Sequence, residues 1–255
     1  MLFLIGLGLG TKDLSALALE EIKEADQLLL ETYTSFIPKE YADFIARQAG
    51  REPKQIKRKD LEDDIKHTVA MAKDKKVVIL VPGDPLIATT HSIILNEAKA
   101  QKIKCEVIHA PSVFSIAIGE SGLDVYKFGP TVTIPFWSDK YKPRSFIDSI
   151  NKNLQNGQHT LVLLDIDQKN SRPMRISEAM EIMMNAISEK SAVSAETEIL
   201  ILANLGRHDK EIRQVKLKDM NSLSKVLEGK VLSLIVPGEL SFAEKDSLYR
   251  VLSNP

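Results

Sequence analysis

Residues 77–91 decide the fold, and they read VVILVPGDPLIATTH. Five consecutive apolar residues rich in valine and isoleucine predict a strand buried on both faces, which Pro82 and Gly83 end. A helical pattern follows over 91–101, so the stretch has the form strand, turn, helix. In open α/β sheets ligands sit outside the carboxyl ends of strands. The turn at 83–91 is therefore a candidate ligand site.

Within this turn, Asp84 is the side chain with the clearest chemistry. At a strand end we expect its carboxylate to be free to accept hydrogen bonds from ribose hydroxyls or an ammonium group. Thr89 and Thr90 can donate from the same turn. The simpler alternative is that Gly-Asp-Pro only makes a good turn, since each of these residue types favours turns. The length of the run favours the ligand site.

A second loop of this kind lies near the start of the chain, where a short apolar strand at 2–5 precedes the glycine run 6–10, GLGLG. Glycines there let backbone approach a ligand closely. Glu31 stands about 20 residues on, where a dinucleotide-binding fold places its ribose-binding acid. Thr11, however, replaces the third glycine of that fingerprint. The loop is therefore read as a ligand contact, with a simple tight strand-to-helix turn as the alternative. If a ligand binds there, a nicotinamide-dependent oxidoreductase competes with an enzyme that uses a different cofactor.

Strands and helices alternate along the whole chain, which predicts an α/β protein. Ala110-Pro111-Ser112 reads as a hinge between two domains, 1–111 and 112–255. The second domain is expected to contain more antiparallel pairing. We expect strands at 2–5, 28–30, 77–81, 106–109, 131–135, 160–165, 198–203, 211–215 and 231–236, and helices near 14–25, 38–48, 60–74, 91–101, 145–154, 176–188 and 219–227.

Composition excludes several classes of protein. Lys plus Arg is 34 and Asp plus Glu is 35, so the net charge of −1 gives no general attraction to nucleic acid or anionic membrane. No stretch approaches about 18 apolar residues, so no membrane span is expected. The single cysteine, Cys105, permits no internal disulfide and indicates a cytoplasmic location. The five histidines are not spaced as metal ligands, so we expect no metal. Met180, Met183 and Met184 are expected to pack in a core.

Together these motifs resemble the diphthine synthases, which belong to the tetrapyrrole-methylase-like (class III) S-adenosylmethionine methyltransferases. The resemblance spans essentially the whole chain, and its most specific parts are ETYTS at 31–35 and GDPLIATTH at 83–91. It is carried by IGLGLG at 5–10, ETYTS at 31–35, VPGDPLIATTH at 81–91, HAPS at 109–112, YKFG at 126–129, HTL at 159–161, LDI at 164–166 and VPG at 236–238.

The resemblance implies two α/β domains of the tetrapyrrole methylase type with the cofactor cleft between them, and a homodimer. It implies S-adenosylmethionine as cofactor and S-adenosylhomocysteine as product. The implied substrate is translation elongation factor 2, whose modified histidine bears a 3-amino-3-carboxypropyl group. Methylation of that amino group gives diphthine, in diphthamide biosynthesis. Three N-methylations are implied for the archaeal type, which this compact chain resembles, whereas eukaryotic relatives add a methyl ester.

The same resemblance implies which residues contact the cofactor. Ser241 stands where many relatives carry a histidine, and the alignment around 204–207 is loose. Carried over by position, the contacts are Leu9, Asp84, Ile87, Ser112, Val113, Leu164, Leu205 and Ser241.

Methyl transfer to an amine requires loss of a proton, because an alkylammonium cannot attack. Asp165, Tyr33 and His91 are candidate acceptors, with water as the alternative. His109, at a strand end, is interpreted as structural. Besides the oxidoreductase, the alternatives are a tetrapyrrole or ribosomal-RNA methylase and a non-enzymatic partner of the translation factor.

Overall fold

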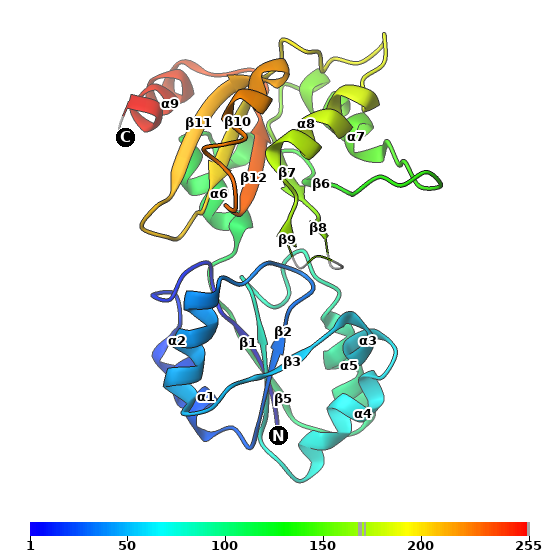
Figure 1. Cartoon of the computed structure of the whole chain (residues 1–255), viewed down its shortest axis with the longest axis vertical. Helices are drawn as coiled ribbons and strands as arrows, with labels where there is room; N and C mark the ends of the chain where they lie inside the picture. The colour runs from blue at the N-terminus through cyan, green and yellow to red at the C-terminus, as the bar shows by residue number, and fades with distance from the viewer. Residues whose placement is uncertain (168–169, 171, 254–255) are drawn as a thin grey trace. The chain divides into compact units, whose positions relative to one another are not determined.

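The computed structural model describes residues 1–167, 170 and 172–253, which fold as two compact units, 1–112 and 113–255 (Figure 1). The expected hinge was Ala110-Pro111-Ser112, with the domain boundary after Pro111, one residue before this division. Each unit is a five-stranded sheet covered by helices. The predicted α/β class is confirmed. Within the described residues, no helix has the length and apolar character that crossing a membrane requires.

The sheet of unit 1 is parallel throughout, in the order β3-β2-β4-β1-β5. Because every strand runs the same way, the carboxyl ends of all five lie at one edge, which we call the carboxyl edge. Every residue of β1 and β4 is buried, as is the last residue of β5, which is what a sheet covered on both faces requires. The strands are β1 (Leu2–Gly6), β2 (Gln27–Glu31), β3 (Lys54–Ile56), β4 (Val77–Val81) and β5 (Cys105–Ile108).

Alternate strand residues bury against different helices. Phe3 and Ile5 pack with α1 (Ala16–Glu24) and α2 (Lys39–Ala49) on one face. The residues between them pack on the other face, shown on the right of Figure 1, with α3 (Arg58–Glu62), α4 (Ile65–Ala70) and α5 (Ser92–Ala100). Consequently the helices that follow the neighbouring strands β1 and β4 leave toward opposite faces. That arrangement is a topological switch point, where open α/β sheets bind ligands.

The predicted helix at 60–74 is wrong in one respect, because the structure divides it into α3, α4 and a 3₁₀ turn, η1 (Met71–Lys73). Asp64 adopts φ −102° and ψ 20°, outside the helical region, and the amides of Asp63 and Asp64 both donate to the carbonyl of Lys59. Strand β3 was not predicted, since only Ile56 of its three residues is buried.

Unit 2 has a mixed sheet in the order β11-β10-β12-β7-β6, in which only the β6–β7 pair is parallel. The expectation of more antiparallel pairing is confirmed. A two-stranded ribbon, β8 (Ile166–Asp167) with β9 (Arg172–Pro173), follows β7. The strands of the main sheet are β6 (Val132–Ile134), β7 (Thr160–Leu164), β10 (Glu198–Ala203), β11 (Glu211–Lys216) and β12 (Leu232–Val236).

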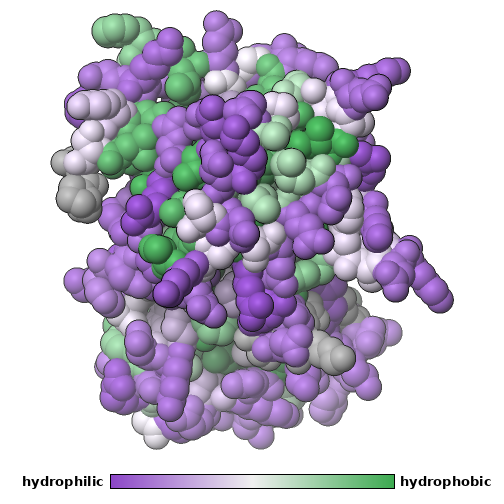
Figure 2. Space-filling view, turned by 45° about the horizontal axis from the view of Figure 1, so that its top comes forward, coloured by the Kyte–Doolittle hydropathy of each residue, from purple (hydrophilic) through white to green (hydrophobic). Residues whose placement is uncertain are grey.

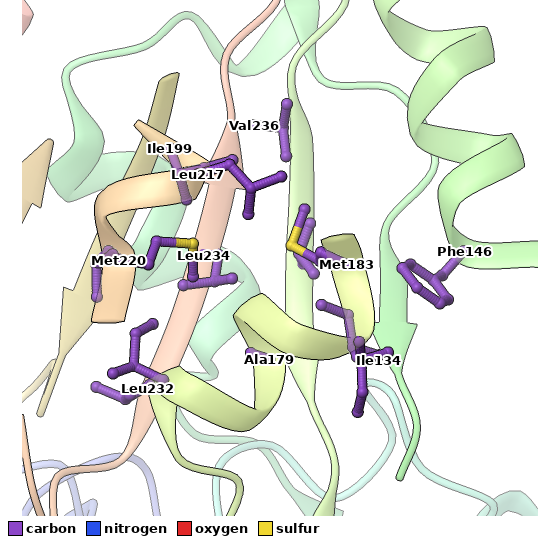
Figure 3. Packing of buried hydrophobic residues seen from close by; sticks show 14 of the residues in the cluster. Ile134, Phe146, Ala179, Met183, Ile199, Leu217, Met220, Leu232, Leu234 and Val236 are labelled. Atoms are coloured by element: carbon purple, nitrogen blue, oxygen red, sulfur yellow. The ribbon is translucent and has the colours of Figure 1, made fainter. Parts of the chain in front are cut away.

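The main core of unit 2 lies between the sheet and the helices α7 (Ser145–Gln155), α8 (Ile176–Ala186) and the 3₁₀ segment η3 (Leu217–Leu223) (Figure 3). Met183 is fully buried there and Met180 packs against it, as predicted, but Met184 is exposed. Helix α6 (Val113–Ser121) and helix α9 (Phe242–Ser253), which contact β7 and β11, were not predicted. The helix expected at 219–227 is instead η3.

Hydrophilic residues cover most of the surface drawn in Figure 2, and hydrophobic residues appear there as smaller areas. Basic and acidic residues are nearly equal in number. The apolar residues of the central strands are instead enclosed in the cores described above.

Candidate functional site

The carboxyl edge of unit 1 holds an Asp–His pair that joins two loops. Asp84 follows β4 and His109 follows β5, on either side of β1. Asp84 Oδ2 accepts a hydrogen bond from His109 Nδ1 (2.8 Å) and one from the amide of Ala110 (3.3 Å), while Oδ1 accepts from the amide of Leu86 (2.9 Å). Asp84 is 5% exposed. The expectation of a free carboxylate is therefore wrong: three hydrogen bonds already hold it.

Gly6, the last residue of β1, lies beneath this junction. A Cβ placed there would stand 2.7 Å from the carbonyl oxygen of Gly83, 2.8 Å from Ala110 Cβ and 2.9 Å from Pro85 Cδ. Real Cβ atoms do not approach other heavy atoms so closely, so the β4 and β5 loops can meet over β1 only because Gly6 has no side chain.

The glycine loop pairs directly with the turn after β4. Gly8 and Gly83 exchange amide-to-carbonyl hydrogen bonds of 3.1 and 2.9 Å, and both have positive φ, +69° and +67°. The amides of Leu9 and Gly10 donate to Asp13 Oδ2 at 2.8 and 3.0 Å. In a dinucleotide-binding loop such amides receive a pyrophosphate. Here a negatively charged side chain already occupies them.

Glu31, the acid expected to bind a ribose in a dinucleotide fold, is buried within its own loop. It is fully buried, and its oxygens accept hydrogen bonds from the amides of Tyr33 and Thr34 and from the Thr34 hydroxyl. Burial raises the pKa of the Glu31 carboxyl, against the lowering effect of these hydrogen bonds and of Arg58. The Glu31 carboxylate therefore stabilises the loop that follows β2 and is not available to a ribose. The oxidoreductase alternative depends on that residue, so it loses its support.

His91 and Tyr33 connect the ETYTS loop to the turn after β4. His91 is fully buried; its Nδ1 donates to the carbonyl of Pro85 (3.1 Å) and its Nε2 lies 3.2 Å from the Tyr33 hydroxyl. The two rings meet edge-on, with centroids 5.9 Å apart. Since a carbonyl only accepts, Nδ1 carries a proton and Nε2 accepts from the tyrosine in the neutral ring. Both ring nitrogens therefore serve the scaffold.

Substituting Tyr33 with phenylalanine is expected to lower the free energy of unfolding by about 0.5–1.5 kcal/mol, because one hydrogen bond to buried His91 is lost while the ring contact stays. Urea unfolding measures the change. The exposed Tyr249, substituted in the same way, is the control and should change by less than about 0.5 kcal/mol. Equal effects would remove the case for a buried Tyr33–His91 bond.

The turn from Asp84 to His91 exposes an apolar side chain and has a strained backbone. Ile87 is 45% exposed, and Ala88 has φ +56°, which is uncommon for a residue with a side chain. The Thr89 hydroxyl and His91 Nδ1 both donate to the carbonyl of Pro85 and hold the turn in this form. Strain of this kind clusters at ligand sites.

Unit 1 brings four predicted cofactor contacts to the carboxyl edge. Leu9 follows β1, Asp84 and Ile87 follow β4, and Ser112 follows β5. Leu9 is half-buried and Ser112 is buried. Their arrangement at the switch point agrees with a ligand site, and their individual contacts stay predictions.

In unit 2 the predicted contacts separate into two groups. Leu164 ends β7 and Leu205 follows β10, at the same end of the sheet, where Leu232 pairs with Ala203. Ser241 follows β12, whose Val236 pairs with Thr160 at the opposite end. Five strand residues, at about 3.3 Å each, separate the two ends. The structure therefore does not bring Ser241 to Leu164 and Leu205. Val113 begins α6.

Ser241 instead precedes α9 and caps its first turn. Its hydroxyl accepts from the amide of Glu244 (3.3 Å), and Glu244 Oε2 accepts from the amide of Ser241 (2.8 Å), which is a capping box. Serine followed three residues later by glutamate was the sequence signal that could have located this helix.

Glu244 is also the centre of a buried polar cluster. Its oxygens accept from Lys127 Nζ (2.7 Å), His159 Nε2 (2.8 Å) and the amide of Asp124 (3.0 Å). Burial alone would raise the pKa of Glu244, but these donors hold it below its ordinary value. His159 Nδ1 accepts from the amide of Gly238 (2.8 Å), so its proton is on Nε2, and burial lowers the pKa of His159. The cluster is structural.

Asp165, the third candidate base, is half-buried and also bonded to the backbone. Its Oδ1 accepts from the amide of Ile166 (2.8 Å) and its Oδ2 from that of Phe136 (3.2 Å). These bonds place the carboxylate at the junction of β6, β7 and the β8–β9 ribbon. The aspartate orders this junction.

A groove of about 780 Å³ lies along β11, the edge strand of unit 2. Its charged side chains pair with one another: Lys210 with Glu120, and Arg213 with Glu211. The groove is lined by none of the predicted cofactor contacts. The geometry therefore favours the carboxyl edge of unit 1 as the candidate site.

Comparison with known proteins agrees with this fold. The family model described as Tetrapyrrole (Corrin/Porphyrin) Methylases matches residues 1–221. The chain therefore belongs to the tetrapyrrole methylases and is a methyltransferase.

Individual relatives show where in this family the chain belongs. The chain is 36% identical to the diphthine synthase of Methanothermobacter thermautotrophicus, covering 100% of this chain and 97% of the relative, and 36% identical to the diphthine methyl ester synthase of Bos taurus, covering 93% and 90%. A crystal structure of diphthine synthase superposes with a TM-score of 0.88 at 29% identity, over 100% of this chain and 97% of that one. Within the methylases, the chain belongs to the diphthine synthase family.

Proposed function

We propose that this enzyme transfers methyl groups from S-adenosylmethionine to the amino group of the modified histidine of translation elongation factor 2, giving diphthine. Support comes from two relatives named diphthine synthase, of which the match covers 97% and 100%. We further propose that it acts in the cytoplasm as a homodimer, without a nucleic-acid or membrane partner. The single cysteine agrees with the cytoplasmic location, and the near-neutral charge agrees with the absence of a nucleic-acid or membrane partner.

The observation that carries the cofactor assignment is the state of the glycine loop. Its amides donate to the Asp13 carboxylate, so the loop opposes a pyrophosphate. S-adenosylmethionine carries a sulfonium cation and no phosphate, and it suits this loop where a dinucleotide does not. A carboxylate can accept about four hydrogen bonds. Asp84 uses three, which leaves one for a ribose hydroxyl or an ammonium.

The proposed contacts in unit 1 are Leu9, Asp84, Ile87 and Ser112, with the exposed face of Ile87 as an apolar support. In unit 2 they are Val113, Leu164 and Leu205. Ser241 is left out of this set because it caps α9. When bound, S-adenosylmethionine supplies a methyl group on a good leaving group. The protein then has to hold the amine in line with it, and good orientation alone can contribute roughly 7–11 kcal/mol.

The function is tested by incubating the protein with labelled S-adenosylmethionine and elongation factor 2 that carries the unmethylated intermediate. We expect label on the factor and, by mass spectrometry, three added methyl groups on nitrogen. A fourth, base-labile methyl would indicate the ester product instead. A factor lacking the 3-amino-3-carboxypropyl group is the control. Absence of label on the intermediate-bearing factor would refute the proposal.

Replacing Asp84 with alanine is expected to weaken the binding of S-adenosylhomocysteine by about tenfold to a hundredfold, because charge-assisted hydrogen bonds contribute about 1.5–3 kcal/mol. Isothermal calorimetry measures the affinity, with NAD as a ligand that should not bind. Asp148→Ala, on the exposed side of α7, is the matched control. Unchanged affinity in Asp84→Ala would overturn the assignment.

A further inference from the structure

We infer that His109 is the general base of the methyl transfer, with Asp84 as the residue that positions it. This inference rests on the proposed function, since it concerns the amine that the enzyme methylates. It replaces the interpretation of His109 as structural and the three bases considered from the sequence, whose polar groups the fold already uses.

The first observation is the orientation of the His109 ring. Nδ1 lies 2.8 Å from Asp84 Oδ2, and a carboxylate oxygen accepts, so Nδ1 carries the proton of the neutral ring. The lone pair is then on Nε2. The side chain of His109 is 65% exposed, whereas that of Asp84 is 7% exposed. A buried carboxylate that fixes the tautomer of an imidazole directs the basic nitrogen outward.

The two buried histidines, His91 and His159, have no ring nitrogen left for a substrate. His91 and His159 are both fully buried, and each bonds through both of its ring nitrogens. His109 has a basic nitrogen directed away from its partner and a side chain that a substrate can reach. His109 therefore has a ring that is fixed in orientation and that a substrate can reach.

The second observation is the position of the pair. His109 directly follows β5, and Asp84 is the second residue of the turn that carries Ile87, at the switch point of the sheet. The Ala110 amide also bonds to Asp84, and Gly6 allows the two loops to approach. The imidazole is thus held to the same turn that we propose for the cofactor, within reach of a group bound at this edge.

The chemical step balances without a further reactant. Nε2 of His109 takes a proton from the ammonium of the substrate, which leaves a neutral amine with its electron pair. That pair forms the new bond between nitrogen and the methyl carbon, while the bond between carbon and sulfur breaks and its electrons stay on the sulfur of S-adenosylhomocysteine. His109 passes its proton to water before the next transfer. The third transfer starts from a dimethylamine and ends with no proton left to lose.

Two variants test this role. His109→Asn places an amide N–H where Nδ1–H stands, so it can keep the bond to Asp84 but has no basic nitrogen. We expect its affinity for S-adenosylhomocysteine to stay within about twofold of the wild type and its kcat to fall by about 10²- to 10⁴-fold, the usual contribution of a general base. His109→Ala should lose a similar factor and regain rate as free imidazole is added.

The control is His67→Asn, which changes an exposed histidine on α4 and should leave both quantities unchanged. Wild-type protein that binds S-adenosylhomocysteine but labels no elongation factor would refute the proposed function itself. If the wild type labels the factor and His109→Asn does so at a similar rate, only the general base is refuted. The same holds if His109→Asn is slow but imidazole fails to restore His109→Ala, since the loss would then be structural.

Discussion

Replacing Glu244 with glutamine is expected to lower the free energy of unfolding of the second unit by about 3–5 kcal/mol, the usual cost of breaking a buried ion pair on one side. Glu244 is 4% exposed and accepts from Lys127, from His159 and from two backbone amides. A neutral amide cannot balance the lysine charge and cannot accept all of these bonds. Urea unfolding followed by circular dichroism measures the loss.

The same cluster makes stability depend on pH. The folded-state pKa of Glu244 lies below its ordinary value of 4.5, so its contribution is present above about pH 4.5 and is lost as the pH falls through and below that value. The pKa of His159 lies below its ordinary value of 6.5, so stability also falls as the unfolded histidine takes up a proton below about pH 6.5. Glu244→Gln should show a smaller decline between pH 5 and pH 3 than the wild type.

Asp246→Asn provides the matched control, because Asp246 is on the same helix but its pair with Arg250 is exposed. Exposed pairs contribute about 0–1 kcal/mol, so this variant should unfold almost like the wild type. If both variants lost equal stability, the loss would come from the helix in general. The buried cluster would then have no special role in holding α9 to the sheet.

Replacing Gly6 with alanine is expected to destabilise the first unit and to weaken its ligand site. The new Cβ would meet a backbone oxygen and two ring or side-chain carbons at 2.7–2.9 Å, and the loops after β4 and β5 cannot shift without breaking the bond between Asp84 and His109. Overpacking of this kind costs typically about 1–3 kcal/mol. We also expect S-adenosylhomocysteine to bind at least tenfold more weakly, because the contacts are displaced.

Thermal melting and calorimetry on one preparation measure both effects. Gly119→Ala is the control: its Cβ would meet nothing within 4 Å, and as a helical position it should gain up to about 1 kcal/mol. A Gly6→Ala protein with normal stability and normal affinity would contradict the close approach of the two loops. A stable protein with weakened binding alone would mean that the loops move apart at little cost.

The roles of the histidines were the least predictable part of the site. His91 lies in one of the two most specific motifs and was one of three candidate proton acceptors, with a core role as the alternative; it is buried and holds the turn in place. His109 looked structural, yet its ring is exposed and oriented by Asp84. The sequence places the two residues in similar surroundings, at the end of a strand or turn. Burial and hydrogen bonding distinguish them, and both depend on parts of the chain that are distant in sequence.

The sequence by itself determined the alternation of strands and helices, the strand at Val77–Val81 and the loops that carry the site, because these follow from local apolar patterns and turn residues. It also determined the family, through strings that extend over the whole chain. Helix 60–74 was only partly right, since its break at Asp64 has no proline or glycine to mark it. The capping box of α9 was a local signal as well, although sequence reasoning did not use it.

Only the tertiary structure decided how these local pieces meet. Asp84 and His109 are 25 residues apart, and they bond because the order β4-β1-β5 places their strands on either side of a strand that ends in glycine. Likewise, antiparallel pairing of β12 with β7 places Ser241 and Leu164 at opposite ends of one sheet. Strand order and direction follow from packing over the whole unit, and short sequence motifs do not contain that information.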